Sequence, residues 1–316
     1  MKILFFGLGS IGKKHLKLIN ELNYEVEVLA FRSGTSNNTI ENISVKEFYS
    51  LDKVFMENPE VAFITNPNHL HMEYAIKAAK NNCHLFIEKP LSNNLDRVDE
   101  LINIVNKKGL ITYIGCDLRF NPVIRKTKEL LQKEVIGEIY STRIECGSYL
   151  PNWRPNRDYR DIYSAKAKMG GGVILDLIHE IDYAYWLFGD IDNLKSYQRQ
   201  ISHLQIETED IAEIILEFSN GIVGNIHLDY YRRTPKRTME IIGEKGVIEA
   251  DLINEKVKID ILNNNKEFNF NTDTDYDYKE QLKYFFNAII NDQNCFNDVI
   301  EGKEVLETAL KAKQEG

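Results

Sequence analysis

Residues 1–16 read MKILFFGLGSIGKKHL. The apolar run at residues 3–6 is followed at once by glycines spaced G-x-G-x-x-G, and a helix-like segment comes next. In that context the first glycine permits a tight turn, the second lets the backbone approach a pyrophosphate, and the third allows helix and strand to pack closely. The pattern predicts a dinucleotide-binding turn, with a purely structural turn as the alternative. The residues of this turn are Gly7, Gly9, Ser10, Ile11 and Gly12.

Short apolar segments alternate with helix-like segments from residue 1 to about residue 118. Examples are EVEVLAF, VKEFYSLDKVFM, VAFITN and HMEYAIKAAKNN, and later HLFIEKP, LDRVDELINIVNKKG and ITYIGCD. Buried strands that alternate with amphipathic helices are typical of right-handed βαβ units in a parallel, doubly wound sheet. Residues 1–118 are therefore predicted to form an α/β dinucleotide-binding domain.

The pattern changes after residues 121–122. A helix is expected near residues 123–133 and a strand near 139–146, followed by an aromatic, Arg-rich loop. Beyond residue 193, strand-like segments follow one another through tight turns, which predicts a largely antiparallel sheet. We expect residues 119–316 to form a second, α+β domain that includes C-terminal helices over 278–313.

Composition and charge narrow the class of protein. The chain has 316 residues, of which 43% are hydrophobic and 28% charged, as in an ordinary folded protein large enough for two domains. Lys and Arg number 39 against 48 Asp and Glu, which gives a net charge of −9. This balance argues against a nucleic-acid surface or a polybasic membrane anchor and favours a small soluble partner.

The N-terminus and the cysteines give two further expectations. The first apolar run is too short for a signal peptide or a membrane span, so a cytoplasmic protein is expected. The four cysteines form no C-x-x-C pair, so neither a metal site nor a disulfide framework is expected.

The end of the second predicted strand bears on cofactor choice. Arg32-Ser33-Gly34 stands twenty residues beyond Gly12, where a carboxylate would hydrogen-bond a ribose 2′-OH. Because an arginine can pair with a 2′-phosphate instead, Arg32 and Ser33 favour NADP(H) over NAD(H). Arg32 could also stack on adenine or be solvated.

A lysine follows another predicted strand, in Glu88-Lys89-Pro90. Ligands of open α/β sheets bind beyond the carboxyl ends of the strands, so Lys89 is expected to point into the nicotinamide crevice. An ordinary surface lysine is the alternative.

The glycine triplet at residues 170–172 is predicted to open a helix from about Val173 to Phe188. A helical projection places one set of residues on a single face: Asp176, His179, Glu180 and Tyr183. The opposite, packing face would carry Leu177, Ile178, Ile181, Ala184, Tyr185 and Phe188. Asp176 and His179 are neighbours on such a helix, so the carboxylate could orient the imidazole, with a solvated acidic face as the alternative.

Five motifs in this order resemble the glucose-fructose oxidoreductase / inositol dehydrogenase / MocA family over nearly the whole chain. They are G-x-G-x-x-G, TNPNHLH (65–71), EKP (88–90), RFNP (119–122) and GGG-x-x-x-D-x-x-H (170–179). The resemblance implies an N-terminal Rossmann domain and a C-terminal domain with a large open, mainly antiparallel sheet that often forms the oligomer interface. It also implies NAD(P)-dependent oxidation or reduction of a carbohydrate-like carbon.

The resemblance also assigns residues. It places Lys89 beside the reacting oxygen, usually with a cis bond to Pro90. It further implies a cofactor-binding set of Thr65, Asn66, Pro67, His71, Glu88, Lys89 and Pro90, and a substrate-binding Arg119. The family usually carries D-x-x-x-H, whereas Asp176 and His179 are three apart here. Because i+3 and i+4 lie on the same helix face, His179 can still point into the site.

We therefore predict hydride transfer between the nicotinamide and a carbinol or keto carbon of a sugar or sugar nucleotide. In the oxidative direction His179 would act as general base, Lys89 would stabilise the developing alkoxide, and Asp176 would orient His179. Which of Asp176 and His179 carries the proton stays open.

The loop at residues 149–163 offers candidates for substrate contacts. Aromatic faces suit sugar rings and arginine suits phosphate. The loop also looks like that of members found with sugar-nucleotide and surface-glycan pathways, although a self-packed surface loop is the alternative. The candidates are Trp153, Arg154, Tyr159, Arg160 and Tyr163.

Two other functions compete with net redox chemistry. Relatives exist that use tightly held NAD for transient oxidation during glycoside cleavage, and a dinucleotide-binding protein with a degenerate site is the non-enzymatic alternative. Retention of Lys89, Asp176 and His179 together argues against the degenerate site. A homodimer or homotetramer through the C-terminal sheet is the expected assembly.

Overall fold

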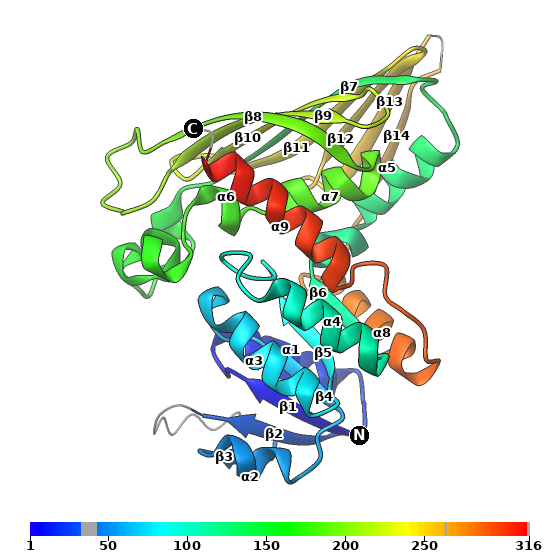
Figure 1. Cartoon of the computed structure of the whole chain (residues 1–316). Coiled ribbons are helices and arrows are strands. Elements are labelled where there is room, and N and C mark those ends of the chain that lie inside the picture. The colour runs from blue at the N-terminus through cyan, green and yellow to red at the C-terminus, as the bar shows by residue number, and fades with distance from the viewer. Residues whose placement is uncertain (33–42, 263, 315–316) are drawn as a thin grey trace. The chain divides into compact units, whose positions relative to one another are not determined.

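The computed structural model describes residues 1–32, 43–262 and 264–314 (Figure 1). The chain divides into two compact units. The first comprises Met1–Asp117 and Asp275–Leu306, and the second comprises Leu118–Thr274 and Glu307–Gly316. Each unit is described by itself below. In the part of the chain that is described, no helix is long and apolar enough to cross a membrane.

The first unit contains a six-stranded sheet in the order β3-β2-β1-β4-β5-β6, in which every neighbouring pair is parallel. This is the strand order of a doubly wound dinucleotide-binding sheet, and it reverses direction between β1 and β4. The predicted Rossmann fold is confirmed. The strands are β1 (Lys2–Phe6), β2 (Glu27–Phe31), β3 (Val45–Phe48), β4 (Val61–Ile64), β5 (His84–Glu88) and β6 (Thr112–Gly115).

The strands of this sheet are continuous apolar runs because both of its faces are covered. Apart from Lys2 and His84, the first residues of β1 and β5, the residues of β1, β4 and β5 are buried, and the Phe63 and Phe86 rings stack with centroids 4.7 Å apart. The connecting helices are α1 (Ser10–Glu21), α2 (Leu51–Phe55), α3 (His71–Lys80) and α4 (Val98–Lys108).

Helix α8 (Tyr276–Ile290) belongs to the first unit, although the sequence predicted it in the second domain. Its buried face explains the difference. The Phe285 ring lies 5.5 Å from that of Phe86 and 6.1 Å from that of Phe63, so the helix covers aromatic side chains of the parallel sheet. Helix α9 (Val299–Gln314) begins in the first unit and ends in the second.

The second unit contains an eight-stranded sheet in the order β14-β13-β12-β11-β7-β10-β9-β8. All neighbouring pairs are antiparallel except β7 and β10, so the predicted open, mainly antiparallel sheet is confirmed. The strands are β7 (Ile139–Gly147), β8 (Ile191–Arg199), β9 (Ile211–Phe218), β10 (Val223–Asp229), β11 (Lys236–Gly243), β12 (Gly246–Asp251), β13 (Lys256–Ile261) and β14 (Lys266–Asn269).

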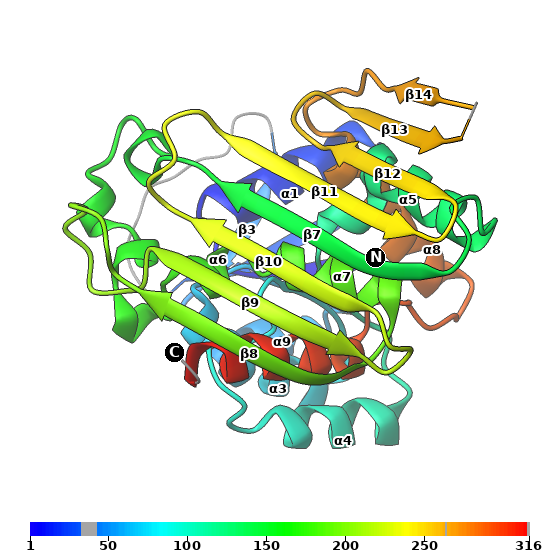
Figure 2. The same cartoon turned by 90° about the horizontal axis from the view of Figure 1, so that it is seen from above.

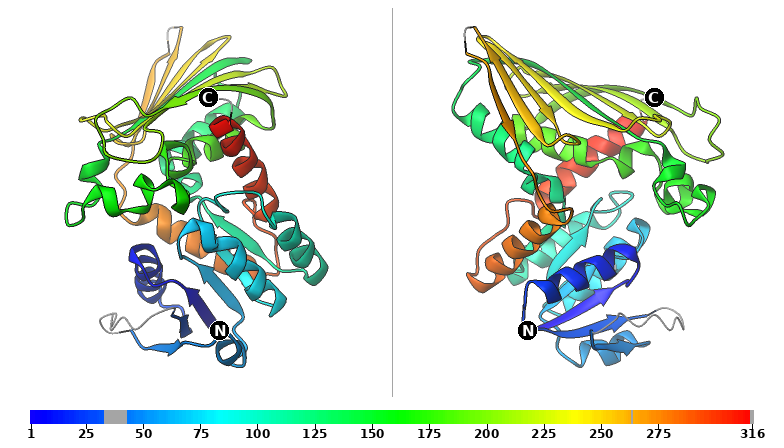
Figure 3. Two further views of the ribbon diagram at one scale, coloured as in Figure 1. Left: turned by 60° about the vertical axis from the view of Figure 1, so that its left-hand side comes forward. Right: turned by 180° about the vertical axis from the view of Figure 1, so that it is seen from behind.

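One face of this sheet is covered by helices of the same unit and the other is bare (Figures 2 and 3). The covering helices are α5 (Pro122–Gln132), α6 (Val173–Asp176) and α7 (His179–Phe188). Strand β9 shows the corresponding period of two, because Ala212, Ile214 and Leu216 are buried while Ile215 is 48% exposed.

The predicted continuous helix from Val173 to Phe188 is wrong, because the chain breaks at residues 177–178 and α7 starts at His179. The alternative of a solvated acidic face on this segment is also wrong. Every residue from 171 to 184 is buried. Glu180 and Asp182 tolerate this burial because they are paired with arginines, whereas Asp176 accepts a hydrogen bond from Tyr230.

Candidate active site

The turn after β1 contains two glycines that no other residue could replace without a clash. A Cβ on Gly12 would lie 2.3 Å from the carbonyl oxygen of Gly7, and one on Gly7, whose φ is +103°, would lie 2.8 Å from the Asn66 nitrogen. A Cβ on Gly9 would meet nothing within 4 Å. Gly9 therefore leaves open space beside the backbone, which is what a pyrophosphate would need at the start of α1.

The residue that follows β4, Thr65, is hydrogen-bonded to β1 and to this turn. The Thr65 amide donates to the Phe6 carbonyl at 3.0 Å, and Thr65 Oγ1 donates to the Gly7 carbonyl at 2.5 Å. Asn66 and Pro67 follow directly. Because the strand order reverses between β1 and β4, these groups line the point where a doubly wound sheet binds its ligand.

His71 contacts the two chain segments that follow β4 and β5. Its Nε2 lies 2.8 Å from the Asn66 carbonyl oxygen and its Nδ1 lies 2.9 Å from that of Pro90. Burial lowers the pKa of His71, so the neutral ring donates its one N–H to either carbonyl. The ring is only 1% exposed, so His71 positions Asn66 and Pro90 rather than contacting a ligand itself, in contrast to its predicted role.

The Lys89–Pro90 peptide bond at the end of β5 is cis, as the family resemblance implied. Glu88, which precedes it, is buried, and its Oε1 lies 2.5 Å from Nε2 of the fully buried His15 on α1. Glu88 therefore links β5 to α1, and Lys89 is the half-buried cation of this motif at the carboxyl end of the strand.

Arg32 ends the second strand of the sheet in the position that the sequence predicted. Its side chain is largely buried, and its Nη1 lies 3.4 Å from Oε1 of Glu47 on β3. Ser33, the other residue predicted here, lies outside the described residues.

In the second unit, Asp176 is the acceptor of a buried phenol cluster. The Tyr230 hydroxyl donates to Oδ2 of Asp176 at 2.6 Å, and the charge of the same carboxylate also acts on Tyr163. Burial, together with the charge of Asp176, raises the pKa of both phenols well above the usual range. Both phenols therefore stay protonated, and the hydrogen bond from Tyr230 stabilises the negative charge of the carboxylate.

His179 is the first residue of α7 and is 8% exposed. The next two acidic side chains, Glu180 and Asp182, are each held by two hydrogen bonds from an arginine. Glu180 accepts from Arg237 on β11 at 2.7 and 3.1 Å, and Asp182 accepts from Arg119 at 3.0 and 2.8 Å. Such bidentate pairs fix the start of α7 and hence the His179 backbone.

These pairs correct one predicted role. Arg119 is 0% exposed and holds Asp182, so it leaves no surface for the substrate contact that the resemblance implied.

The glycine triplet is held by a residue that sequence reasoning missed. Gly172 has φ of +115°, and a Cβ there would lie 2.3 Å from Oε1 of Glu209. Glu209 also pairs with Lys313 at the end of α9, at 2.9 Å. Nothing local in the sequence connects Glu209 to residues 170–172, because the contact joins distant segments.

The loop at residues 149–163 divides into two groups of contacts. The Trp153 ring lies edge-on to Tyr230 at 5.3 Å, and the Arg154 guanidinium lies 5.9 Å from the Tyr163 ring, so both adjoin the phenol cluster. Arg160 instead pairs with Asp158 at 2.9 Å, and its neighbour Tyr159 accepts a hydrogen bond from the Gln205 amide. The self-packed alternative thus describes the second group.

Comparison with known proteins places these two units in one family. Residues 1–116 match the oxidoreductase family with an NAD-binding Rossmann fold, and residues 124–249 match the GFO/IDH/MocA C-terminal domain. A myo-inositol 2-dehydrogenase of Thermotoga maritima is 30% identical over 271 residues, which cover 81% of this chain and 76% of the relative. The chain belongs to the GFO/IDH/MocA oxidoreductase family.

Solved structures of GFO/IDH/MocA-like proteins share the whole fold. UDP-N-acetylglucosamine 3-dehydrogenase GnnA from Acidithiobacillus ferrooxidans has a TM-score of 0.82 at 21% identity, with 100% of this chain and 97% of that chain covered. Levoglucosan dehydrogenase in complex with NADH and levoglucosan has a TM-score of 0.87 at 17% identity, with coverages of 100% and 98%.

Membership of the GFO/IDH/MocA family makes the chain a nicotinamide-dependent oxidoreductase. The turn after β1 fits the cofactor, because its glycines leave open backbone at the start of α1. Sequence reasoning had found Asp176 and His179 but missed Tyr230 and Arg237. Tyr230 stands at the end of β10 without a motif of its own, so only the fold connects it to Asp176.

The two glycines of the turn should respond differently to the same added methyl group. Gly9→Ala should unfold with nearly the free energy of the parent, because its Cβ meets no protein atom, yet bind NAD(H) at least ~10-fold more weakly because the methyl blocks the pyrophosphate. Gly12→Ala should lose stability as well, because its Cβ clashes with Gly7. Denaturant unfolding and cofactor titration test this. Unchanged NAD(H) affinity in Gly9→Ala would contradict the dinucleotide turn.

Proposed function

We propose that this oxidoreductase transfers a hydride between NAD(P)(H) and a CH–OH or C=O carbon of a sugar or sugar nucleotide. The observation that carries the proposal is the surroundings of Asp176. This buried carboxylate accepts a hydrogen bond from Tyr230 and stands three residues before His179, the first residue of α7. Relatives whose names describe dehydrogenases of inositol, levoglucosan and UDP-N-acetylglucosamine support a carbohydrate substrate.

The nicotinamide supplies hydride transfer at C4, and the residues of the chain handle charge and protons. Lys89 stabilises the alkoxide that develops on the substrate oxygen, and His179 accepts the hydroxyl proton in the oxidative direction. The Tyr230 hydroxyl supports His179 as the proton carrier, because its hydrogen bond to Oδ2 of Asp176 stabilises that carboxylate as an anion. Asp176 then provides fixed negative charge beside the developing imidazolium.

Cofactor binding falls to backbone groups at the strand ends of the first unit. The Gly7–Gly12 turn, including Ser10 and Ile11, cradles the pyrophosphate, while the segments from Thr65 to Pro67 and from Glu88 to Pro90 line the nicotinamide side. Arg32 gives a preference for NADP(H), because its guanidinium can exchange Glu47 for a 2′-phosphate.

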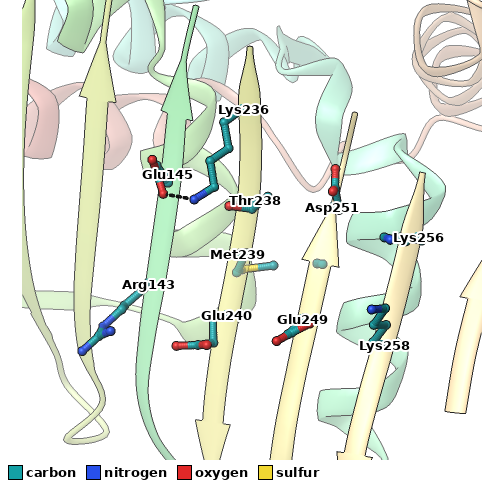
Figure 4. A pocket seen from close by; sticks show the side chains of 11 residues that line it. Arg143, Glu145, Lys236, Thr238, Met239, Glu240, Glu249, Asp251, Lys256 and Lys258 are labelled. Atoms are coloured by element: carbon teal, nitrogen blue, oxygen red, sulfur yellow. Dashed lines mark hydrogen bonds and ion pairs between the residues drawn. The ribbon is translucent and has the colours of Figure 1, made fainter. Parts of the chain in front are cut away.

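The bare face of the eight-stranded sheet is the surface for a homodimer or homotetramer. It holds a hollow of about 470 Å³ between β7, β11, β12 and β13 (Figure 4). The charged residues that line it are four cations and four anions: Arg143, Lys236, Lys256 and Lys258, with Glu145, Glu240, Glu249 and Asp251. A surface with equal numbers of both signs can meet a two-fold related copy of itself with opposite charges facing.

Lys89→Ala and His179→Ala should each lower turnover at least ~10²-fold while NAD(P)(H) affinity stays within a few-fold, because both groups act on the substrate oxygen and its proton. The assay follows nicotinamide absorbance with a panel of cyclic polyols and UDP-, GDP- and dTDP-sugars. Reduced cofactor should form in proportion to product. Release of a glycan fragment without net reduction would indicate the glycoside-cleaving alternative, and near-parental turnover in Lys89→Ala would remove that residue from the mechanism.

Arg32→Ala should weaken NADP(H) binding at least ~10-fold and NAD(H) binding far less, because only NADP(H) offers a phosphate. Glu47→Gln is the matched variant: it removes the carboxylate that competes for Arg32, so NADP(H) affinity should rise. Equal losses for both cofactors in Arg32→Ala would instead indicate stacking on adenine.

Light scattering should give a mass of two or four times 36.7 kDa for the parent protein. Glu249→Lys reverses a charge at the centre of the hollow and should shift the protein toward monomer, whereas Glu73→Lys on α3 makes the same charge change elsewhere and should not. A monomeric parent would contradict the proposed assembly.

A further inference from the structure

Two segments of the second unit concentrate positive charge in a chain that is acidic overall. Residues 148–170 and 230–237 contain nine Lys and Arg but only two Asp, whereas the net charge of the chain is −9. Clusters of one sign in an oppositely charged protein attract ligands of the opposite charge.

The two segments lie beside each other at one end of the sheet. They follow β7 and β10, parallel neighbours whose last residues, Gly147 and Asp229, are register partners (Figure 2). The Leu150 amide donates to the Tyr230 carbonyl at 2.8 Å, and the Arg233 guanidinium lies 3.6 Å from the centroid of the Tyr149 ring.

Most cations of this cluster are already neutralised by carboxylates. Arg160 pairs with Asp158, Lys166 with Asp161, Arg232 with Asp229 and Glu145, Lys236 with Glu145, and Arg237 with Glu180. Within the described ranges, four cations of the cluster have no carboxylate within 4.0 Å: Arg154, Arg157, Lys168 and Arg233. Arg154 and Arg233 differ from the other two because their guanidinium groups lie against aromatic rings, those of Tyr163 and Tyr149.

Arg154 also lies next to the proposed proton-handling groups. Its guanidinium lies 5.9 Å from the Tyr163 ring, and its neighbour Trp153 packs on Tyr230, whose hydroxyl donates to Asp176. A guanidinium held against an aromatic face is partly desolvated and preorganised, so it gains most from an anion that arrives with the ligand.

We propose that the substrate is an anionic sugar derivative whose phosphate or carboxylate is bound by Arg154 and Arg233. The inference rests on the proposed sugar oxidoreductase function and narrows its substrate class. Guanidinium groups bind phosphate and carboxylate through paired N–H donors, whereas a neutral polyol offers these two arginines no counter-charge.

Binding to the NADH-saturated protein is measured by calorimetry with three anionic probes, UDP, inorganic pyrophosphate and glucuronate, and with neutral myo-inositol. Saturation with NADH keeps UDP from the cofactor site. At least one anion should bind, more weakly as NaCl rises, and Arg154→Gln and Arg233→Gln should each weaken it at least ~10-fold. Preference for UDP over glucuronate would identify phosphate as the anion, and the reverse would identify carboxylate.

Arg160→Gln is the matched control from the same loop. Asp158 already neutralises Arg160, so its loss should change anion affinity less than twofold. Arg154→Lys keeps the positive charge but lacks the paired N–H donors of a guanidinium, so its anion affinity should lie between those of the parent protein and Arg154→Gln. With an anionic substrate that turns over, Arg154→Gln should raise KM while kcat changes little, which a general loss of folding would not produce.

The proposal is overturned if none of the anions binds the parent protein, or if Arg160→Gln weakens binding as much as Arg154→Gln. Unchanged oxidation of a neutral polyol in both arginine variants, without any anion binding, would refute the anion site and leave the oxidoreductase function intact. Anion binding that depends on Arg154 in a protein that oxidises no carbohydrate would refute the sugar oxidoreductase function instead.

Discussion

The first unit depends on one close approach of backbone to backbone. The start of α1 lies so near the end of β1 that a methyl group on Gly12 would stand 2.3 Å from the Gly7 carbonyl oxygen. Thr65 donates its hydroxyl to that same oxygen and so draws the end of β4 to the turn. Further along the chain, the buried His71 ring lies between the carbonyl oxygens of Asn66 and Pro90 and donates its one N–H to either of them, so it links the segments after β4 and β5. The close contact between Gly7 and Gly12 is thus connected to the ends of three strands, β1, β4 and β5.

The second unit is organised around buried charge rather than around a glycine turn. Glu180, Asp182 and Arg119 are removed from water, which costs free energy that well-formed bidentate hydrogen bonds offset, and the partner of Glu180, Arg237, is only partly exposed. Losing one partner of such a buried pair costs about 3–5 kcal/mol. The helix that carries His179 is therefore fixed at its first turn by interactions unavailable to an exposed acidic helix.

The eight-stranded sheet separates two kinds of surface. Alternation along the strands places apolar side chains under the helices, while the bare face carries charged side chains together with exposed apolar ones such as Ile215. The bare face balances its charges within itself, as the Glu145–Lys236 pair shows, whereas the loops at the end of β7 and β10 keep an excess of cations. A balanced surface suits contact with a copy of the same chain, and an unbalanced one suits a small anion.

The sequence by itself determined the parallel first sheet, the dinucleotide turn, the antiparallel second sheet, and the placement of Lys89 at a strand end. These features follow from local pattern, namely strand–helix alternation, glycine spacing and apolar periodicity, which a single sequence contains. The tertiary structure decided the rest. It assigned α8 to the first unit through Phe285, interrupted the helix between Asp176 and His179, buried Arg119, and brought Tyr230 and Glu209 to residues far from them in sequence. Helical projection treats a segment as if one face met water, and it fails where buried partners from distant strands satisfy both faces.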